Sequence, residues 1–495
     1  MNLNIVKAIL ECGKHQPDKI ALVHNENSLS YSELVTRIKK VAHGFKQKGF
    51  HHDKIAILST NRIEFVEVFL GIIYAGCVPI PLDPKWSQSE VNTILQQCDP
   101  RMIFTEEAYT RNLRMSDNEI PLLTFSHEET CSYAGWIDSL NPAAEVDETN
   151  ELLFIAFTSG TTGVPKGYMR THLSWMKSFE ATSEAFEFHN MEHIMAPGPF
   201  VHSLSLFALM QSLVSGATFH IVEHFHAKKV LELCENIPGM ILFVVPTMIE
   251  SMMREAIPGR AYMQALISSG GKWSEGSKKR SMEVFGGAKM YEFYGSSEAS
   301  YISYIDVYAE NKPNSVGKPF RGVEISIRDE HFKELPVGEI GQLYIRSEMM
   351  FSGYYGLPDE TANVFRDGWL MLGDYVSIDE NGYLHLAGRA KNMIVSGGLN
   401  VFAEEVESVM QLIPAIEEVM VFGQPDDYWG EQVTALIQWS GEEHLSLKEI
   451  KEHCRRYLAS YKAPKQLITV DQFIYTSSGK IARHEMKEYM RRVML

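Results

Sequence analysis

Short apolar runs alternate with segments of helical spacing along most of the chain. Runs rich in β-branched and aromatic residues lie at 55–58 (IAIL), 152–157 (LLFIAF), 241–245 (ILFVV) and 290–294 (MYEFY). Segments such as 171–186 and 247–256 have the apolar spacing of helices. Alternation of this kind predicts an α/β fold with largely buried strands.

The pattern changes after residue 389, where the segments become short and closely spaced. Residues 446–461 open with a capping box, Ser446 and Glu449, and stop before Pro464. Their apolar stripe consists of Ile450, Cys454, Leu458 and Tyr461. We therefore predict a helix over 446–461 and a small separate C-terminal domain that begins near residue 390.

Composition and charge narrow the possible functions. The chain has 495 residues and a net charge of −17, which argues against nucleic acid or an anionic membrane surface as the main partner. Its six cysteines are scattered without a C-x-x-C pair, which is typical of buried thiols in a reducing compartment. The longest uncharged run, 68–82, contains two prolines and is too short to span a membrane, so we expect it in the core. We expect no signal peptide, no integral membrane association and a cytoplasmic location.

The segment 157–170, FTSGTTGVPKGYMR, has the composition of a phosphate-binding loop but differs from the Walker P-loop. Pro165 before Lys166 has no N–H to donate, and Gly167 after it has no hydroxyl for a metal ion. Hydroxyls, glycine N–H groups and one cation remain to hold a polyphosphate. A surface turn rich in threonine and glycine is the simpler alternative.

Several further segments occur in an order that resembles a known family. They are LSYSEL at 29–34, GIIYAGCVPIPLDP at 71–84, the loop at 158–167, YGSSE at 294–298, the stretch 369–407 and SSGKIAR at 477–483. Together they resemble the AMP-forming acyl-CoA synthetases of the adenylate-forming superfamily, over essentially the whole chain. The resemblance implies an α/β fold with a large N-terminal domain of mixed sheets and helices, residues 1–389. It also implies a small mobile α+β C-terminal domain, residues 390–495, with a hinge near Lys391.

The resemblance implies a two-step ligase that uses ATP, Mg²⁺ and coenzyme A. A carboxylic acid is first converted to an acyl-adenylate with release of pyrophosphate, and a thiol then displaces AMP. Lys166 would bind the leaving phosphates together with the loop residues Thr158, Ser159, Gly160, Thr161 and Thr162. Glu298 would hold Mg²⁺, because this hard cation takes few protein ligands and prefers oxygen.

The same resemblance assigns roles around the nucleotide. Tyr294 would offer a flat face to adenine, Ser297 a hydroxyl to the α-phosphate, and Asp374 a carboxylate to the ribose. The remaining nucleotide positions are Gly270 and Gly271, where the backbone would approach the nucleotide or acyl group, and Arg389. For Gly270 and Gly271 an ordinary β-turn is an equal alternative, and for Asp374 or Arg389 taken alone a surface ion pair would be expected.

The remaining assignments concern the second step and the acid. Lys480 would pair with the carboxylate and α-phosphate oxygens during adenylation, whereas Gly397 and Gly398 would line the path of the thiol. His202 would contact the substrate without removing a proton, because a carboxylate nucleophile needs no base; a core histidine is its alternative. The family commonly has threonine at the position of Leu372.

Gly295 stands where acetyl-CoA synthetases of this family have tryptophan, so we expect room for an acid larger than acetate. The methionines Met210, Met240, Met248, Met252 and Met253 suit a plastic apolar pocket, although each could equally belong to the core. A fatty or other apolar acid is the expected substrate. An aryl or dicarboxylic acid is an alternative substrate, because Arg170 or Lys272 could bind a second carboxylate.

Three other functions are alternatives. The acceptor could be the phosphopantetheine of a carrier protein in place of free coenzyme A. A kinase or motor NTPase would form ADP, and the altered Walker pattern speaks against it. A non-catalytic acyl-binding relative would be expected to lack Lys166, Glu298 or Lys480, and all three are present.

Overall fold

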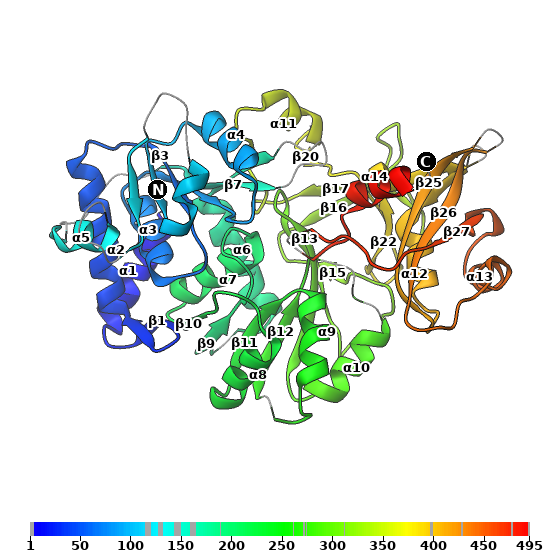
Figure 1. Cartoon of the computed structure of the whole chain (residues 1–495), viewed down its shortest axis with the longest axis horizontal. Helices are drawn as coiled ribbons and strands as arrows, with labels where there is room; N and C mark the ends of the chain where they lie inside the picture. The colour runs from blue at the N-terminus through cyan, green and yellow to red at the C-terminus, as the bar shows by residue number, and fades with distance from the viewer. Residues whose placement is uncertain are drawn as a thin grey trace.

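The computed structural model contains a large N-terminal and a smaller C-terminal domain, side by side along the long axis (Figure 1). It describes the whole chain except residues 1–3, 114–119, 127–131, 143–149, 159–164, 189, 261, 271–272, 274, 311, 397–398, 427–428, 477–478 and 494–495. Helices and strands alternate through most of the N-terminal domain. The predicted α/β fold is thereby confirmed.

The N-terminal segment builds a four-stranded parallel sheet in the order β4-β3-β5-β6. Its strands are β3 (Lys54–Leu58), β4 (Val78–Leu82), β5 (Met102–Thr105) and β6 (Leu122–Thr124). The helices of this region are α1 (Val6–His15), α2 (Tyr31–Gln47), α3 (Ile63–Tyr74), α4 (Gln88–Cys98) and α5 (Tyr133–Asp138), with the 3-10 helix η1 (Glu107–Leu113). The uncharged run 68–82 is the end of α3 and all of β4. It is buried throughout, as predicted.

A nine-stranded sheet forms the centre of the domain, in the order β15-β14-β13-β12-β11-β9-β10-β1-β2. The strands are β1 (Ile20–His24), β2 (Asn27–Ser30), β9 (His193–Met195), β10 (Thr218–Ile221), β11 (Met240–Val244), β12 (Met263–Ser268), β13 (Lys289–Ser296), β14 (Ser300–Asp306) and β15 (Lys318–Pro319). All neighbours from β1 to β13 are parallel, and β2, β14 and β15 add antiparallel edges.

Helices cover both faces of this central sheet, which explains why its strands read as continuous apolar runs. In β11, Leu242 packs into a cluster with α8 (Ala227–Asn236), α9 (Pro246–Glu255) and α10 (Glu275–Phe285). Its neighbours Ile241 and Phe243 point to the opposite face. That face belongs to the main core, together with residues of α6 (His172–Ala185) and α7 (Ser203–Val214).

Two smaller sheets complete the N-terminal domain. The first consists of β7 (Leu152–Thr158), β8 (Lys166–Thr171) and β18 (Gly353–Tyr354), all antiparallel. The second contains β16 (Glu324–Arg328), β17 (Gly341–Arg346), β19 (Phe365–Arg366), β20 (Trp369–Leu370), β21 (Asp374–Ile378) and β22 (Leu384–Arg389), with α11 (Pro358–Val364) between β18 and β19 along the chain.

The C-terminal domain has one five-stranded sheet with helices on both faces. Its strands are β23 (Met393–Ser396), β24 (Leu399–Phe402), β25 (Ile416–Asp426), β26 (Gly430–Trp439) and β27 (Gln466–Thr469). The helices are α12 (Ala403–Met410), α13 (Leu447–Cys454), α14 (Arg483–Val493) and the 3-10 helix η3 (Ser460–Lys462). Lys391 lies in η2 (Ala390–Asn392), directly between β22 and β23. The boundary at residues 389 and 390 stays a prediction.

The continuous helix predicted over 446–461 is wrong, although its capping box is present. The helix ends at Cys454, and the chain turns before η3. Leu458 and Tyr461 still pack against the cluster that holds Ile450 and Cys454. The apolar spacing therefore predicted the buried side of this segment correctly. The length predicted for the helix from the same spacing was too great. No helix in the described ranges is long and apolar enough to cross a membrane.

Candidate active site

A buried carboxylate, Asp374, lies at the start of β21 beside two of the predicted site residues. The Tyr294 hydroxyl donates to its Oδ2 at 2.8 Å, and Arg389 Nε donates to its Oδ1 at 2.7 Å. Asp374 and Arg389 are also register partners across β21 and β22. Burial, followed by the charge of Asp374, raises the pKa of Tyr294 well above its usual value. Each carboxylate oxygen can accept a second hydrogen bond, so Asp374 keeps capacity for ribose hydroxyls.

Two lysines lie within electrostatic reach of Arg389 and Asp374. Burial lowers the pKa of Lys391, and the positive charge of Arg389 lowers it further. The pKa of Lys480 is lowered by loss of water, then by Arg389 and Lys391, while Asp374 raises it. Lys480 and Lys391 are nevertheless exposed residues, so the loss of water is confined to the parts of their side chains that face the cluster. Glu404 also acts on Arg389 and Lys391, so three cations face two carboxylates. The excess of positive charge suits phosphate groups.

Lys480 reaches this cluster from the C-terminal domain. Its turn is held by hydrogen bonds from the Gly479 amide to the Thr476 carbonyl at 2.9 Å and from the Thr476 amide to the Lys480 carbonyl at 2.8 Å. Gly479 has a φ of +77°, a conformation that favours glycine. A Cβ at Gly479 would lie 3.2 Å from Oγ1 of Thr247, at the start of α9. The turn is thus placed against the N-terminal domain.

Lys166 and Glu298 are joined through Tyr354. Lys166 is the first residue of β8, and its Nζ pairs with Glu360 Oε2 at 2.6 Å. The same ammonium lies 5.7 Å from the centre of the Tyr354 ring. The Tyr354 hydroxyl donates to Glu298 Oε1 at 2.9 Å. The predicted phosphate-binding lysine and metal-binding carboxylate therefore share one polar network.

Some predicted positions fall outside the described residues. These are Ser159, Gly160, Thr161, Thr162, Gly271, Gly397 and Gly398. Thr158 ends β7 as the register partner of Lys166. Gly270 is described and has a φ of +90°, so a glycine-favouring turn follows β12. Their assigned roles stay predictions.

Arg170 supports the backbone at Ser297 and is not free to bind a substrate. Its Nη1 donates to the Ser297 carbonyl at 2.9 Å, and its Nη2 donates to the Met349 carbonyl at 2.6 Å. The residue is 2% exposed, and burial lowers the pKa of its guanidinium to about 10. The alternative that Arg170 serves a second substrate carboxylate is therefore not supported. Lys272, the other candidate, lies outside the described residues.

Gly295 has a backbone reason to be glycine. A Cβ at this position would lie 2.1 Å from the Ser300 carbonyl oxygen on the antiparallel neighbour β14. Real Cβ atoms do not approach this closely, so any side chain would force the two strands apart. A tryptophan at 295 would consequently disturb the sheet, whatever its effect on the length of an acyl pocket.

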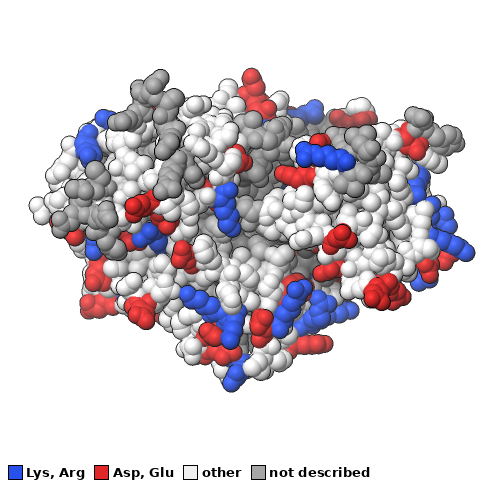
Figure 2. All heavy atoms as spheres, viewed as in Figure 1, with Lys and Arg blue, Asp and Glu red and all other residues white. Residues whose placement is uncertain are grey.

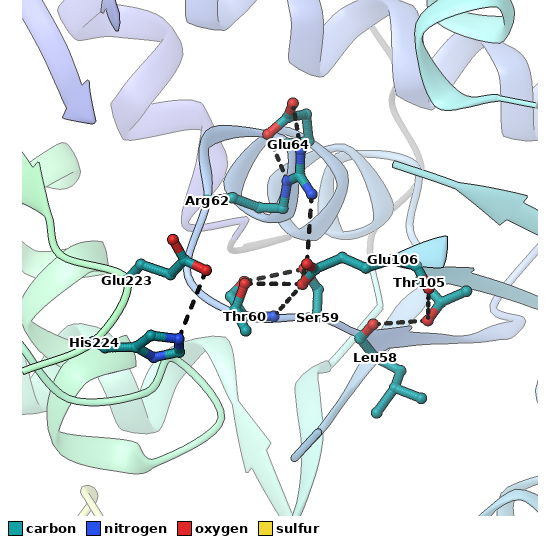
Figure 3. Close-up of polar contacts among 9 residues, drawn as sticks. All are labelled: Leu58, Ser59, Thr60, Arg62, Glu64, Thr105, Glu106, Glu223 and His224. Atoms are coloured by element: carbon teal, nitrogen blue, oxygen red, sulfur yellow. Dashed lines mark hydrogen bonds and ion pairs between the residues drawn. The ribbon is translucent and has the colours of Figure 1, made fainter. Parts of the chain in front are cut away.

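A polar cluster at the carboxyl end of β3 fixes the loop that follows this strand (Figure 3). Glu106 Oε1 accepts hydrogen bonds from the Ser59 hydroxyl, the Thr60 amide and the Thr60 hydroxyl at 2.7–2.9 Å. Arg62 lies between this carboxylate and Glu64, to which it donates two hydrogen bonds at 2.9 and 3.0 Å. The carboxyl ends of parallel strands are common places for ligand sites.

Asn61, in the middle of this loop, positions the segment that carries His202. Its Nδ2 donates to the Gly198 carbonyl at 2.8 Å, and its Oδ1 accepts from the Phe200 amide at 2.8 Å. His202 is the residue at the N-cap position of α7, and its side chain makes no capping hydrogen bond. Its Nε2 lies 3.6 Å from Oδ2 of Asp83, the residue that follows β4. The structure thus places His202 beside a buried carboxylate that the sequence patterns did not single out.

The residues present suit ATP and a magnesium ion by their chemistry. The part of the chain that the structure describes holds no cluster of three or more metal-binding side chains. Mg²⁺ normally takes one or two carboxylates and completes its shell with phosphates and water. Glu298, linked to Lys166 through Tyr354, is such a single carboxylate. The cations around Asp374 would face the remaining phosphate charge.

Comparison with known proteins agrees with this geometry. The family model "AMP-binding enzyme" matches residues 10–355, and "AMP-binding enzyme C-terminal domain" matches residues 405–480. The chain belongs to the AMP-binding enzyme family. It is an AMP-forming acyl-CoA ligase of that family, as the sequence motifs predicted.

Named relatives of this AMP-binding enzyme extend over nearly its full length. "Uncharacterized acyl--CoA ligase YhfT" of Bacillus subtilis is 33% identical, covering 96% of both chains. "Putative long chain fatty acid-CoA ligase VraA" of Staphylococcus epidermidis is 30% identical, over 97% of this chain and 98% of the relative. The 2-succinylbenzoate–CoA ligase of Oceanobacillus iheyensis is 29% identical, over 95% and 96%.

Solved structures share the whole fold. ATP-bound MatB from Rhodopseudomonas palustris superposes with a TM-score of 0.92 at 25% identity, covering 100% of both chains. O-succinylbenzoate coenzyme A synthetase from Bacillus subtilis, in complex with AMP, has a TM-score of 0.85 at 23% identity over 98% of both chains, which supports the fold alone.

Tyr354, Glu360 and Asp83 lie against predicted site residues, and Asn61 holds the segment before His202. None of the four was predicted from the sequence. Asp83 alone had a usable signal, because it directly follows the buried run that forms β4. Polar residues at the carboxyl end of a parallel strand often line a site. The others depend on contacts between distant segments.

Proposed function

We propose that this enzyme converts an apolar monocarboxylic acid, in the first place a fatty acid, to its coenzyme A thioester. The observation that carries the proposal is the cluster of Arg389, Lys391 and Lys480 around Asp374, drawn from both domains. It provides positive charge for an anionic substrate in a chain whose net charge is −17.

In the first step, a carboxylate oxygen of the acid attacks the α-phosphorus of ATP, and pyrophosphate leaves with the broken P–O bond. Lys480 would pair with the attacking carboxylate and the α-phosphate, while Lys166 would bind the leaving phosphates. Glu298 would hold Mg²⁺, which when bound neutralises phosphate charge. Preorganised charges of this kind stabilise the charge that develops in the transition state.

In the second step, the coenzyme A sulfur attacks the acyl carbon and AMP leaves. The names of relatives support coenzyme A as the acceptor, since YhfT and VraA are both named CoA ligases. A carrier-protein phosphopantetheine offers the same thiol. Assaying thioester formation with free coenzyme A and with a phosphopantetheinylated carrier protein distinguishes the two.

The choice of acid rests on two observations. Both Nη groups of Arg170 donate hydrogen bonds to backbone carbonyls, so neither is available for a second carboxylate of the substrate. The VraA relative is named for a long chain fatty acid. Met210, Met240 and Met252 are fully buried in the core and give no support for a plastic acyl pocket.

An aryl or dicarboxylic acid is the second candidate, because the 2-succinylbenzoate–CoA ligase is almost as similar as VraA. Carboxylate-dependent exchange between ATP and pyrophosphate tests both. We expect exchange with aliphatic monocarboxylic acids of increasing chain length, and none with the matching alcohols. Exchange confined to benzoates or to dicarboxylic acids would overturn the fatty acid assignment.

A further inference from the structure

Asp83 and His202 form a pair of polar groups that the two steps above leave without a role. Asp83 is 1% exposed, and its Oδ1 accepts a hydrogen bond from the Lys85 amide at 2.9 Å. Its Oδ2 and the Nε2 of His202 are both buried without a hydrogen bond partner, 3.6 Å apart. Buried polar atoms normally find partners, so two unpaired atoms that face each other call for an explanation.

The separation is slightly too long for a direct hydrogen bond. Such bonds are often long in ligand-free enzymes and shorten when substrate binds. A small rotation of the imidazole would bring Nε2–H onto the carboxylate. Asp83 would then hold the ring orientation and keep the second nitrogen, Nδ1, unprotonated.

The surroundings of His202 suit a neutral base. About a third of its side chain, 33%, is exposed, so one edge of the ring stays accessible. Burial lowers the pKa of His202; the charge of Asp83 raises it, and those of Lys85 and Lys480 lower it. These groups come from the loop after β4 and from the C-terminal turn. At neutral pH the ring therefore has a lone pair available.

The second step of the reaction is the one that requires a base. A thiol with a pKa near 8.5 is only a few per cent ionised at pH 7, and the thiolate is the nucleophile. The carboxylate that attacks ATP is already ionised. Both steps involve the same carboxyl carbon, so a group placed beside the acid in the first step is also beside the thiol in the second.

We propose that Asp83 positions His202 to accept the thiol proton during thioester formation. Nδ1 takes the proton from sulfur, and the sulfur forms its bond to the acyl carbon. The bond from that carbon to the phosphate oxygen of AMP breaks, and AMP leaves with the electron pair. The imidazolium then loses its proton to solvent. This inference rests on the proposed function.

The test uses pre-formed acyl-adenylate and coenzyme A with the full-length enzyme and its Asp83→Asn variant. We expect thioester formation at pH 7 to slow on the order of 10²-fold, the usual contribution of a positioned base. The rate should recover as the pH rises through the ionisation of the thiol itself, near 8.5. Adenylation, followed as acid-dependent hydroxamate formation from ATP and hydroxylamine, should fall far less.

Two further variants make the outcome decisive. His202→Gln should show the same recovery at high pH. Asp53→Asn, just before β3 at the opposite end of the sheet, should leave both half-reactions as they are. Equal losses in both half-reactions, or a loss of thioester formation that does not recover with pH, would overturn the role of the pair. Absence of acid-dependent hydroxamate in the wild type would instead refute the proposed function.

Discussion

The ion pair between Lys166 and Glu360 holds the loop lysine where phosphates are expected to bind. Both side chains are partly exposed, at 27% and 47%, so the pair is one that a ligand can replace. Glu360 would compete with ATP for the ammonium. We expect Glu360→Gln to lower the KM for ATP by up to about fivefold, since exposed pairs contribute roughly 0.2–1 kcal/mol, with kcat nearly unchanged.

The neighbouring Asp359→Asn is the matched control, because Asp359 is exposed in the first turn of the same helix, α11. It changes the local charge equally without removing the partner of Lys166. A similar fall in KM for both variants would indicate a general charge effect. A rise in KM for Glu360→Gln would show that Glu360 helps to bind the nucleotide, contrary to the prediction.

Individual site residues could be predicted where they belong to a sequence motif. The residues that contact them could not be predicted. Lys166, Glu298 and Asp374 could be chosen from short patterns. The Lys166–Glu360 pair joins residues 194 positions apart, and the Tyr294–Asp374 bond joins residues 80 apart. Such contacts follow from the packing of sheets, and periodicity within one segment carries no information about them.

Glu404 of helix α12 holds residues 389–392, the link between the two domains. Its carboxylate accepts hydrogen bonds from Asn392 Nδ2, beside the predicted hinge, and from the Arg389 amide at 3.4 Å. These bonds belong to the arrangement in which Lys480 lies within electrostatic reach of Asp374. We expect Glu404→Ala to slow adenylation several-fold, because fewer molecules hold this arrangement, and to leave thioester formation from supplied acyl-adenylate unimpaired.

Glu405→Ala is the matched control on the same helix. Glu405 pairs with Lys462 at 2.7 Å inside the C-terminal domain and does not contact the link. Its loss should affect the stability of that domain and both half-reactions alike. The assignment of Glu404 to the link fails if the two variants show the same ratio between half-reactions.

For helices and strands, the sequence predicted the positions of the elements more reliably than the residues at which they end. The runs at 241–245 and 290–294 are strands of the central sheet, as their composition indicated. The helix predicted to reach residue 461 ends at Cys454. Apolar spacing indicates which side of a segment is buried. A turn that packs its side chains on the same core keeps this spacing, so the spacing does not show where the helix ends.

Charge over the whole molecule contrasts with charge at the site. The chain carries 63 acidic and 46 basic residues, and Figure 2 shows both kinds mixed over the face in view. The cluster around Asp374 reverses this balance locally, with Arg389 at the end of the N-terminal domain, Lys391 in the connection that follows it and Lys480 near the C-terminus. We therefore expect the binding of a triphosphate to depend on the arrangement of the two domains.

The central claim is that Lys480 completes this cluster for adenylation and is not required afterwards. Lys480→Ala should reduce acyl-adenylate formation on the order of 10²–10³-fold, the cost of one preorganised donor at developing charge. The same preparation, given acyl-adenylate and coenzyme A, should form thioester at close to the wild-type rate. A folded Lys480→Ala enzyme that loses both half-reactions equally, or that adenylates normally, would contradict the account.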